Sequence, residues 1–293
     1  MKKVIIVSPD PIYGGALVLF KVNQLLNDEG IDSKVFISNA YRNPELPVII
    51  FWIKWIIKTV MHIGKNVYNG KKFRRKYTPF IDKKNTIVIY PEKIYGNYLG
   101  AQNVIRYFLY YNKYPNNAYG KDDLFICYRK QFNDYNLNPD ENQLFIECFD
   151  KNIYRKYNYE KRNGKCYIIR KGKDRKDLPT EFDGPIIDNL SEEEKVKVFN
   201  ECEYCYSYDT QTFYTKIASY CGCIPIVVTE DGKNINNYVT SEDKRYGIAY
   251  GDSASEIEYA KRTQKDLIEE INNIEKNNIN SIKKFIKLLE KVF

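Results

Sequence analysis

Histidine is almost missing from this sequence: His62 is the only one among 293 residues. A metal centre built on histidine ligands is therefore excluded. Cys221 and Cys223 lack the second cysteine pair that a zinc site needs, which favours buried packing for both. The seven cysteines are odd in number and form no paired framework, so they argue against a secreted disulfide scaffold and indicate reduced thiols.

Long apolar runs are missing as well. No stretch of about 18 residues is both apolar and free of charge, so the sequence contains no clear membrane span. The apolar run after Lys2 and Lys3 is too short for a signal peptide and lacks a small-residue cleavage site. These absences predict a cytoplasmic protein. The chain is 43% hydrophobic, so it can build cores, and its length predicts about two domains.

Positive charge is concentrated in one segment. The chain has 46 Lys and Arg against 38 Asp and Glu. Residues 41–80 hold this whole excess, with Glu45 as their one acid, and the rest of the chain is balanced. A neutral protein with one basic segment calls for a specific partner of that segment.

Strand and helix patterns alternate in the first half. A strand over 3–8, the loop 9–15, a helix over 16–28 and a strand over 33–38 form a β-α-β unit, which predicts a parallel sheet and a Rossmann-like start. The loop is Pro-Asp-Pro-Ile-Tyr-Gly-Gly and not G-x-G-x-x-G, so a dinucleotide site is weakly supported. The further predictions are strands at 86–90, 124–128 and 143–148 and a helix at 100–111.

A second α/β series follows a Lys-, Tyr- and Asn-rich linker at about 150–164. Its predicted strands are 166–170, 204–206 and 224–228, and its predicted helices are 191–202, opened by a capping box, 212–220 and the region 253–293. We therefore expect an α/β protein with two Rossmann-like domains facing across a cleft. The expected domains are 1–155 and 156–293, with the C-terminal helical region packing back toward the first domain.

The second half contains a block that resembles a known family. Residues 206–227 combine an acidic residue, a short helix ending in Ala and a Cys-Gly pair, and a strand with Pro near its start. This block resembles the donor-binding signature of GT-B glycosyltransferases. The Gly14-Gly15 loop and the basic strand end at 168–173 resemble the family's phosphate-facing segments. Tyr90-Pro91-Glu92, with 96–101, resembles members that synthesise bacterial surface polysaccharides.

The resemblance implies that a sugar moves from a nucleotide-sugar donor to a glycan or lipid-linked acceptor, in the synthesis of capsule, O-antigen or a similar polysaccharide. Glu92 is the candidate general base or acceptor ligand, and Asp209 is the second catalytic candidate. The expected donor-binding residues are Gly14, Gly15, Arg170, Lys171, Lys173, Asp209, Thr210 and Thr212. Asp209 matches the first acidic position of the retaining branch of the family, but Ile217 occupies the second. The resemblance therefore does not assign a retaining mechanism.

A nucleoside diphosphate leaving group builds charge on its phosphate oxygens, and a metal ion or fixed donors must neutralise that charge. Metal-using glycosyltransferases normally carry an Asp-x-Asp motif. This sequence has none, and the adjacent pair Asp122 and Asp123 has the wrong spacing. We therefore expect no metal and no cofactor, with the nucleotide-sugar as co-substrate. Basic side chains at a strand end and the N-terminus of the helix near Thr212 are expected to bind the diphosphate.

The basic segment 46–76 has the periodicity of a helix. Lys54, Lys58, His62 and Lys65 form one polar stripe, and the rest of 48–63 is apolar and holds both tryptophans. A membrane-spanning helix would bury the lysines, so we predict an interfacial helix on the anionic inner membrane face. A core helix or a dimer interface is the alternative. The expected membrane contacts are Trp52, Lys54, Trp55, Lys58, Lys71, Lys72, Arg74 and Arg75.

Other functions fit some of these features. A GT-B-fold nucleotide-sugar epimerase belongs to the same class, and a non-catalytic subunit that kept the fold is a second alternative. A non-catalytic nucleic-acid- or membrane-binding protein is a third. Nucleic acid is the least favoured partner, because the basic residues interleave with an aliphatic helix and not with an exposed aromatic surface.

Overall fold

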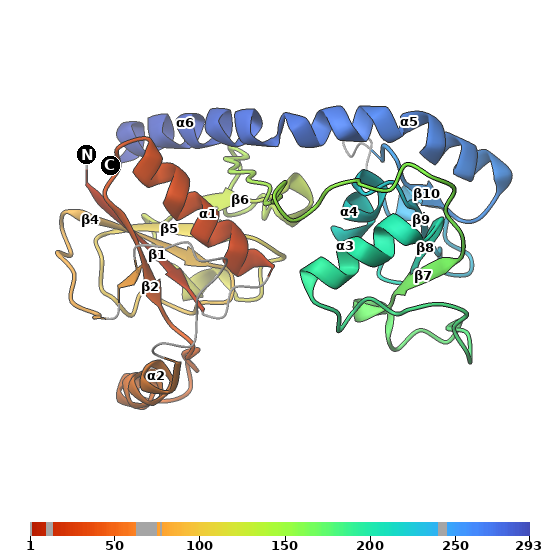
Figure 1. Ribbon diagram of the computed structural model, residues 1–293. Coiled ribbons are helices and arrows are strands. Elements are labelled where there is room, and N and C mark those ends of the chain that lie inside the picture. The colour runs from red at the N-terminus through yellow and green to blue at the C-terminus, as the bar shows by residue number, and fades with distance from the viewer. Residues whose placement is uncertain (1, 10–13, 63–74, 77, 240–244) are drawn as a thin grey trace. The chain divides into compact units, whose positions relative to one another are not determined.

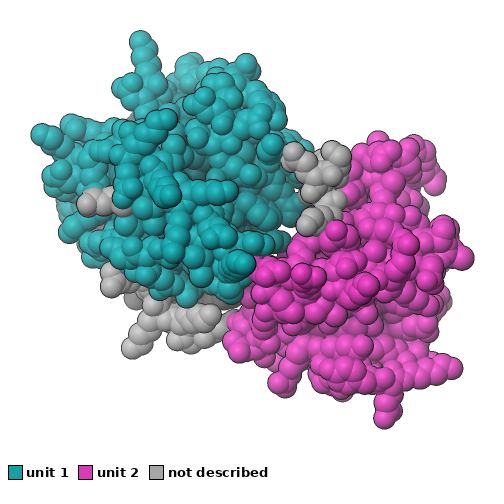
Figure 2. All heavy atoms as spheres, turned by 90° about the horizontal axis from the view of Figure 1, so that it is seen from above, with its two compact units in different colours: residues 1–148, 275–293 teal, residues 149–274 magenta. Residues whose placement is uncertain are grey.

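The structure is a computed structural model that describes residues 2–9, 14–62, 75–76, 78–239 and 245–293 (Figure 1). The chain divides into two compact units (Figure 2). Unit 1 consists of residues 1–148 and 275–293, and unit 2 of residues 149–274. Each unit has one sheet, and all strand pairs in the described residues are parallel. The predicted α/β class is confirmed.

The sheet of unit 1 has the strand order β3-β2-β1-β4-β5-β6. This is the order of the Rossmann fold, which reverses between β1 and β4, and ligands of such sheets bind at the carboxyl ends near that point. The strands are almost continuously buried, as expected for a parallel sheet covered on both faces. Their bounds are β1 Lys3–Ser8, β2 Ser33–Ile37, β3 Arg75–Lys76, β4 Thr86–Pro91, β5 Asn103–Phe108 and β6 Leu124–Cys127.

Helices cover both faces of this sheet. On one face, α1 (Gly15–Asp28) and α6 (Ile274–Val292) share a core with β1, β4 and β5. On the other, α2 (Val48–His62) contributes Phe51 and Trp55 to a cluster with Phe36 and Tyr90. Two 3₁₀ turns follow β5 and β6: η1 (Asn116–Ala118) and η2 (Lys130–Phe132). None of the described helices is both long and apolar enough to cross a membrane.

The sheet of unit 2 has the order β10-β9-β8-β7. Its helices α3 (Glu192–Glu201) and α4 (Tyr214–Tyr220) pack on one face, while α5 (Ala254–Asn272) packs against Ile226 and Ala249. The predicted capping box opens α3, since Ser191 and Glu194 each accept a hydrogen bond from the other's backbone N–H. The strands are β7 Lys165–Ile168, β8 Tyr204–Ser207, β9 Ile224–Val227 and β10 Ala249–Tyr250, and the 3₁₀ turns are η3 Arg170–Gly172 and η4 Ile235–Asn237.

Two predicted elements of unit 1 were wrong. Residues 100–111 contain the strand β5 and no helix, because the run Val104–Phe108 is buried on both faces and has no helical stripe. A run this short, with Arg106 at its centre, cannot be distinguished from a segment of a buried helix by its periodicity. The predicted strand 143–148 makes only an isolated bridge between Gln143 and Cys127.

The division into units differs from the predicted domains at both ends. The first boundary lies between Cys148 and Phe149, a few residues before 155. Residues 275–293, placed in the second domain by sequence, belong to unit 1. The physical reason is that Ile282, Phe285 and Leu289 on α6 are buried in the core of unit 1.

The cysteines are free, and six of the seven are buried. Cys221 and Cys223 lie in the core of unit 2, which confirms the predicted packing role. Burial raises the pKa of the Cys221 thiol to about 12, so this thiol stays protonated at neutral pH. Among the described residues, no group of three or more His, Cys, Asp or Glu side chains is arranged to hold a metal ion.

Candidate functional site

A cavity of about 410 Å³ lies at the carboxyl ends of three strands of unit 2. Its walls come from the segment after β7, the segment after β8 and Glu230 after β9. Ligands of open parallel sheets bind at this edge. The lining residues are Lys171, Gly172, Asp174, Arg175, Tyr208, Asp209, Thr210, Gln211 and Glu230.

The turn after β7 is held tightly against the end of β8. A Cβ on Gly172 would lie 2.4 Å from the Tyr208 carbonyl oxygen, so only glycine fits there without a backbone shift. Arg170 has a φ of 38°, which is unusual for a residue with a side chain. Its N–H donates to Asp188 over 2.7 Å, and the N–H of Ile169 donates to the same carboxylate over 3.2 Å. These two bonds hold the turn in its strained conformation.

Arg175 joins the three segments of the cavity wall. Its Nη1 donates to the carbonyl oxygens of Val228, over 2.8 Å, and of Tyr208, over 3.3 Å. Its Nε donates to Asp177 over 2.9 Å, and the Asp177 carboxylate balances its charge. The remaining charged groups of the wall are Lys171 and three carboxylates. The cavity is therefore mixed in charge, with two basic side chains and three carboxylates in its wall.

The predicted donor-binding residues of unit 2 fall into two groups. Lys171, Asp209 and Thr210 line the cavity. Arg170, Lys173 and Thr212 lie outside its lining. The Arg170 guanidinium lies 5.1 Å from the centre of the Tyr214 ring.

Asp209 and Thr212 shape the segment between β8 and α4. Asp209 is 3% exposed, and its Oδ1 accepts a hydrogen bond from the Gln211 N–H over 3.1 Å. The Thr212 hydroxyl oxygen accepts from the Tyr214 N–H at the start of α4. Since α4 has only seven residues, we assign no anion site to its N-terminus.

Arg175 and Glu230 were not among the residues predicted from the sequence. Arg175 lies in a run of alternating charges, and its contacts with Val228 and Tyr208 exist only in the folded unit. Glu230 comes shortly after the predicted strand 224–228, so its position at a strand end was a usable signal.

In unit 1, Glu92 directly follows β4, at the edge where the strand order reverses. Its side chain is 5% exposed, and its Oε2 accepts a hydrogen bond from the Leu109 N–H over 3.1 Å. Burial raises the pKa of the Glu92 carboxyl and outweighs the hydrogen bonds that lower it. A buried carboxyl with a raised pKa at a ligand-binding edge is suited to proton transfer.

Gly14 and Gly15 begin α1 at the same edge. Gly14 has a φ of 50°, which favours glycine, and it precedes the helix without a side-chain cap. A Cβ on Gly15 would lie 3.1 Å from a methyl carbon of Leu109. Leu109 therefore contacts both Glu92 and the start of α1. The rest of the predicted glycine loop, residues 10–13, lies outside the described residues.

The basic segment is only partly as predicted. Trp55 is 6% exposed, stacks on Phe36 and donates a hydrogen bond from Nε1 to the Ile37 carbonyl oxygen over 2.8 Å. It is a core residue and not a membrane contact. Trp52 is half-buried against Trp55 and Tyr98.

The basic side chains of this segment differ in how far the structure describes them. Lys54 and Lys58 are exposed, and Lys58 Nζ donates to the Asn39 carbonyl oxygen. Arg75 lies in β3. Lys71, Lys72 and Arg74 lie outside the described residues.

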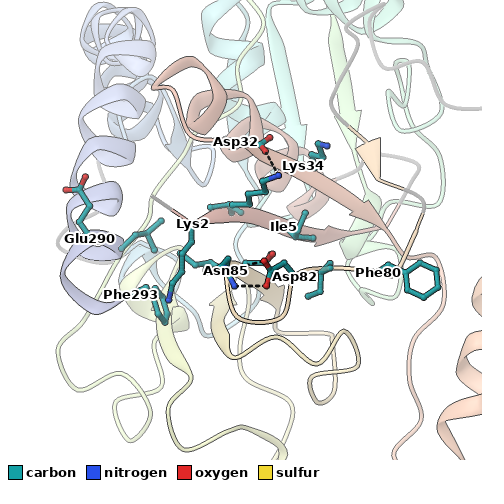
Figure 3. A pocket seen from close by; sticks show the side chains of 15 residues that line it. Lys2, Ile5, Asp32, Lys34, Phe80, Asp82, Asn85, Glu290 and Phe293 are labelled. Atoms are coloured by element: carbon teal, nitrogen blue, oxygen red, sulfur yellow. Dashed lines mark hydrogen bonds and ion pairs between the residues drawn. The ribbon is translucent and has the colours of Figure 1, made fainter.

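A larger cavity, of about 830 Å³, lies at the opposite, amino end of the unit 1 sheet (Figure 3). Lys3 and Asp32 form an ion pair of 3.7 Å at its wall. Asp82 accepts hydrogen bonds from the backbone N–H of Asn85 and from its side-chain amide. The three lysines and three acidic residues that line this cavity balance in charge. The cavity also lies away from the edge where parallel sheets bind ligands. We do not assign the functional site to it.

Comparison with known proteins gives no match to a family model and none to a curated protein. Three solved structures are similar over nearly the whole chain. Sucrose-phosphate synthase from Thermosynechococcus elongatus has 9% identity and a TM-score of 0.42, with 97% of this chain and 94% of that chain covered. The spinosyn forosaminyltransferase SpnP has 9% identity and a TM-score of 0.39, with 98% and 95% covered. The glycotransferase of kitacinnamycin has 6% identity and a TM-score of 0.40, with 100% and 99% covered.

Proposed function

We propose that the protein is a glycosyltransferase that moves a hexosyl or related sugar from a nucleotide-sugar donor to a glycan or lipid-linked acceptor. The proposed role is surface polysaccharide synthesis, such as that of capsule or O-antigen. One observation carries the proposal. The block that resembles a donor-binding signature contributes three residues to the cavity at the carboxyl edge of the unit 2 sheet: Tyr208, Asp209 and Thr210.

The proposed donor site uses both signs of charge. Lys171 and neighbouring backbone N–H groups would bind the diphosphate, with no metal ion involved. Asp209 and Glu230 would accept hydrogen bonds from donor hydroxyls. The glutamate that binds ribose in the retaining branch has no counterpart, because Ile217 at that position is 3% exposed in the core. Glu230, from the next strand end, supplies a carboxylate to the same cavity.

The proposed acceptor site is the carboxyl edge of unit 1, with Glu92 as the base. Its raised pKa brings the carboxyl closer to neutral pH than an exposed glutamate, which improves a general base. The acceptor hydroxyl would give its proton to the Glu92 carboxylate as its oxygen attacks the donor sugar. Nucleoside diphosphate then leaves from unit 2.

We further propose that the enzyme is cytoplasmic and docks on the inner membrane face through α2. The outward side of α2 is apolar, and six of its side chains are between 52% and 65% exposed. We call them the outer face of α2: Ile49, Ile53, Ile56, Ile57, Val60 and Met61. Lys54 and Lys58 lie beside this face, so the helix combines an apolar surface with charges that favour anionic lipid.

A thermal-unfolding screen of the full chain against nucleoside diphosphates and nucleotide-sugars tests the proposed donor site. A ligand at 100 times its Kd should stabilise the protein by about 2.7 kcal/mol. Lys171→Ala should weaken this effect, while Lys173→Ala, a matched exposed lysine outside the cavity lining, should leave it unchanged. If no nucleotide stabilises the wild-type protein, the proposed function is wrong.

A further inference from the structure

Two tyrosines and a phenylalanine form an exposed aromatic cluster on the loops after β5 and β6. Tyr110 and Tyr111 are 40% and 49% exposed, and both rest on Phe132, which is 8% exposed. The ring centres of the three residues are 4.9 to 5.1 Å apart. We call these three residues the aromatic platform.

The loop that carries the platform is fixed by hydrogen bonds. The Asn112 side-chain oxygen accepts from the Tyr119 hydroxyl over 2.6 Å and from the Tyr114 N–H over 3.1 Å. Its Nδ2 donates to Asp134 over 2.9 Å. The two tyrosines are thus held in solvent by an ordered loop. Aromatic rings that stay exposed do not contribute hydrophobic stabilisation to the fold. Exposed rings that cluster on an ordered loop therefore indicate a contact surface.

The platform is continuous with the candidate acceptor site. Leu109, the residue before Tyr110, donates its N–H to Glu92 and contacts the start of α1 at Gly15. The platform therefore begins one residue away from the contact that holds the proposed base.

We propose that the platform binds a sugar ring of the acceptor. This inference rests on the proposed function, because it assigns a residue set and a ligand class to the acceptor side of that reaction. A sugar ring has an apolar face of C–H groups and an edge of hydroxyls. Aromatic rings suit the face, and the two phenol groups suit the hydroxyls.

The geometry favours a sugar over other occupants. The rings of Tyr110 and Tyr111 meet at 73°, so they form a corner and not a flat surface. A planar nucleobase would stack on one ring only, whereas a chair-shaped sugar can contact both. A protein partner is less favoured, because two half-exposed rings are a small part of the roughly 1,200–2,000 Å² that a stable interface buries.

The test measures binding of the full-length, fluorescently labelled chain to an array of bacterial surface oligosaccharides. We expect the wild-type protein to bind, and the Y110A/Y111A variant to bind about tenfold more weakly or worse, because both stacking contacts are lost. Y110F/Y111F should keep most of the affinity. Y157A/Y159A, which removes two exposed tyrosines of unit 2, is the matched control and should bind as the wild type does.

Three results would overturn the inference. The wild-type protein could bind no oligosaccharide, the double alanine variant could bind with unchanged affinity, or that variant could alter the oligomeric state in light scattering, which would make the platform a protein contact. Nucleoside diphosphate binding, measured by calorimetry on the same variants, separates this inference from the proposed function. Loss of platform binding with normal nucleotide binding supports the inference, and a wild-type protein that binds glycans but no nucleotide contradicts the proposed transferase.

Discussion

The carboxyl edges of the two sheets carry different kinds of side chain. In unit 1, the edge has a buried carboxyl, Glu92, with Lys93 and Lys113 near it, and half-exposed tyrosines such as Tyr110 and Tyr111. In unit 2, the edge has a cavity whose wall combines Lys171 and Arg175 with Asp209 and Glu230. The same architecture, parallel strands that end at one edge, thus supports one surface with exposed aromatic rings and another with a cavity lined by charges of both signs.

The difference shows that the segments after the strands, and not the sheets, set the chemistry of each edge. In unit 2, the tight approach of Gly172 to Tyr208 and the hydrogen bonds of Arg175 bring charged segments together. In unit 1, the contact between Leu109 and Glu92 joins the segments after β4 and β5 and keeps the carboxyl from water. Each edge can therefore be tested without altering the other.

The largest expected effect is on turnover through unit 1. Glu92→Gln removes the proposed base but keeps the size and the hydrogen-bond acceptor of the side chain. Turnover should fall by about 10²–10⁴-fold, as for loss of a general base. Donor affinity, measured by calorimetry, should be unchanged because it depends on unit 2. An active Glu92→Gln variant would show that unit 1 does not supply the base.

The next effect concerns the outer face of α2. I53E/I57E should abolish sedimentation with anionic phosphatidylglycerol vesicles, because each buried Ile contributes about 1.5–3 kcal/mol. I268E/I279E, on α5 and α6, is the matched control. Trp55 fluorescence should change little on binding, since that ring is already buried. If the wild-type protein does not sediment, α2 is better interpreted as a subunit interface.

Arg175→Ala tests whether the Arg175 guanidinium holds the proposed donor site of unit 2 together. The loss of hydrogen bonds from a charged group should reduce nucleoside diphosphate binding by about 1.5–3 kcal/mol. Arg170→Ala, which changes an exposed residue outside the lining, should bind within about twofold of the wild type. If calorimetry shows that Arg170→Ala loses more nucleoside diphosphate affinity than Arg175→Ala, the diphosphate binds at Arg170, as the sequence predicted.

A smaller effect is the pH dependence of stability. Because the pKa of Glu92 is raised in the folded state, the folded chain holds a proton that the unfolded chain has already released. The contribution of Glu92 to folding therefore becomes less favourable as pH rises from the unfolded pKa toward the folded one. Relative to Glu92→Gln, the wild-type protein should be most stable at the acid end of a urea-unfolding series. If the difference in the free energy of unfolding between the two proteins does not change with pH, the raised pKa of Glu92 is contradicted.

The smallest expected effect is that of chelation. If fixed donors of unit 2 neutralise the leaving group, turnover should survive excess EDTA once a donor and an acceptor are known. Loss of turnover with rescue by manganese or magnesium would overturn this prediction.

The elements whose apolar patterns are uninterrupted were predictable from the sequence. The first strand, the Gly14-Gly15 loop and the first helix were predicted because an apolar run, a glycine pair and a 3.6-residue stripe follow one another. The strand β5 was missed because Arg106 interrupts its apolar run, and the sequence does not show that this arginine is buried. For α2, the sequence could not show which side of a mostly apolar helix faces the core, so Trp55 was assigned to the membrane.

The candidate sites were predictable only where one chain segment carries the signal. Glu92 was found because it directly follows a strand, and Asp209 was found because it belongs to the block 206–227 that resembles a donor-binding signature. Arg175 was not, because its role depends on the carbonyl oxygen of Val228, more than fifty positions away. The aromatic platform depends on Phe132, which comes from the loop after a different strand.

The packing of α6 has a consequence for the order in which the chain acquires its structure during synthesis. Unit 2 is complete once residue 274 has left the ribosome, but the core of unit 1 still lacks Ile282, Phe285 and Leu289. Domains of most chains fold first at the N-terminus. Here unit 1 must wait for residues 275–293, while unit 2, which is inserted within it, can fold first. The synthesis of α6 is therefore the step that allows unit 1 to close its core.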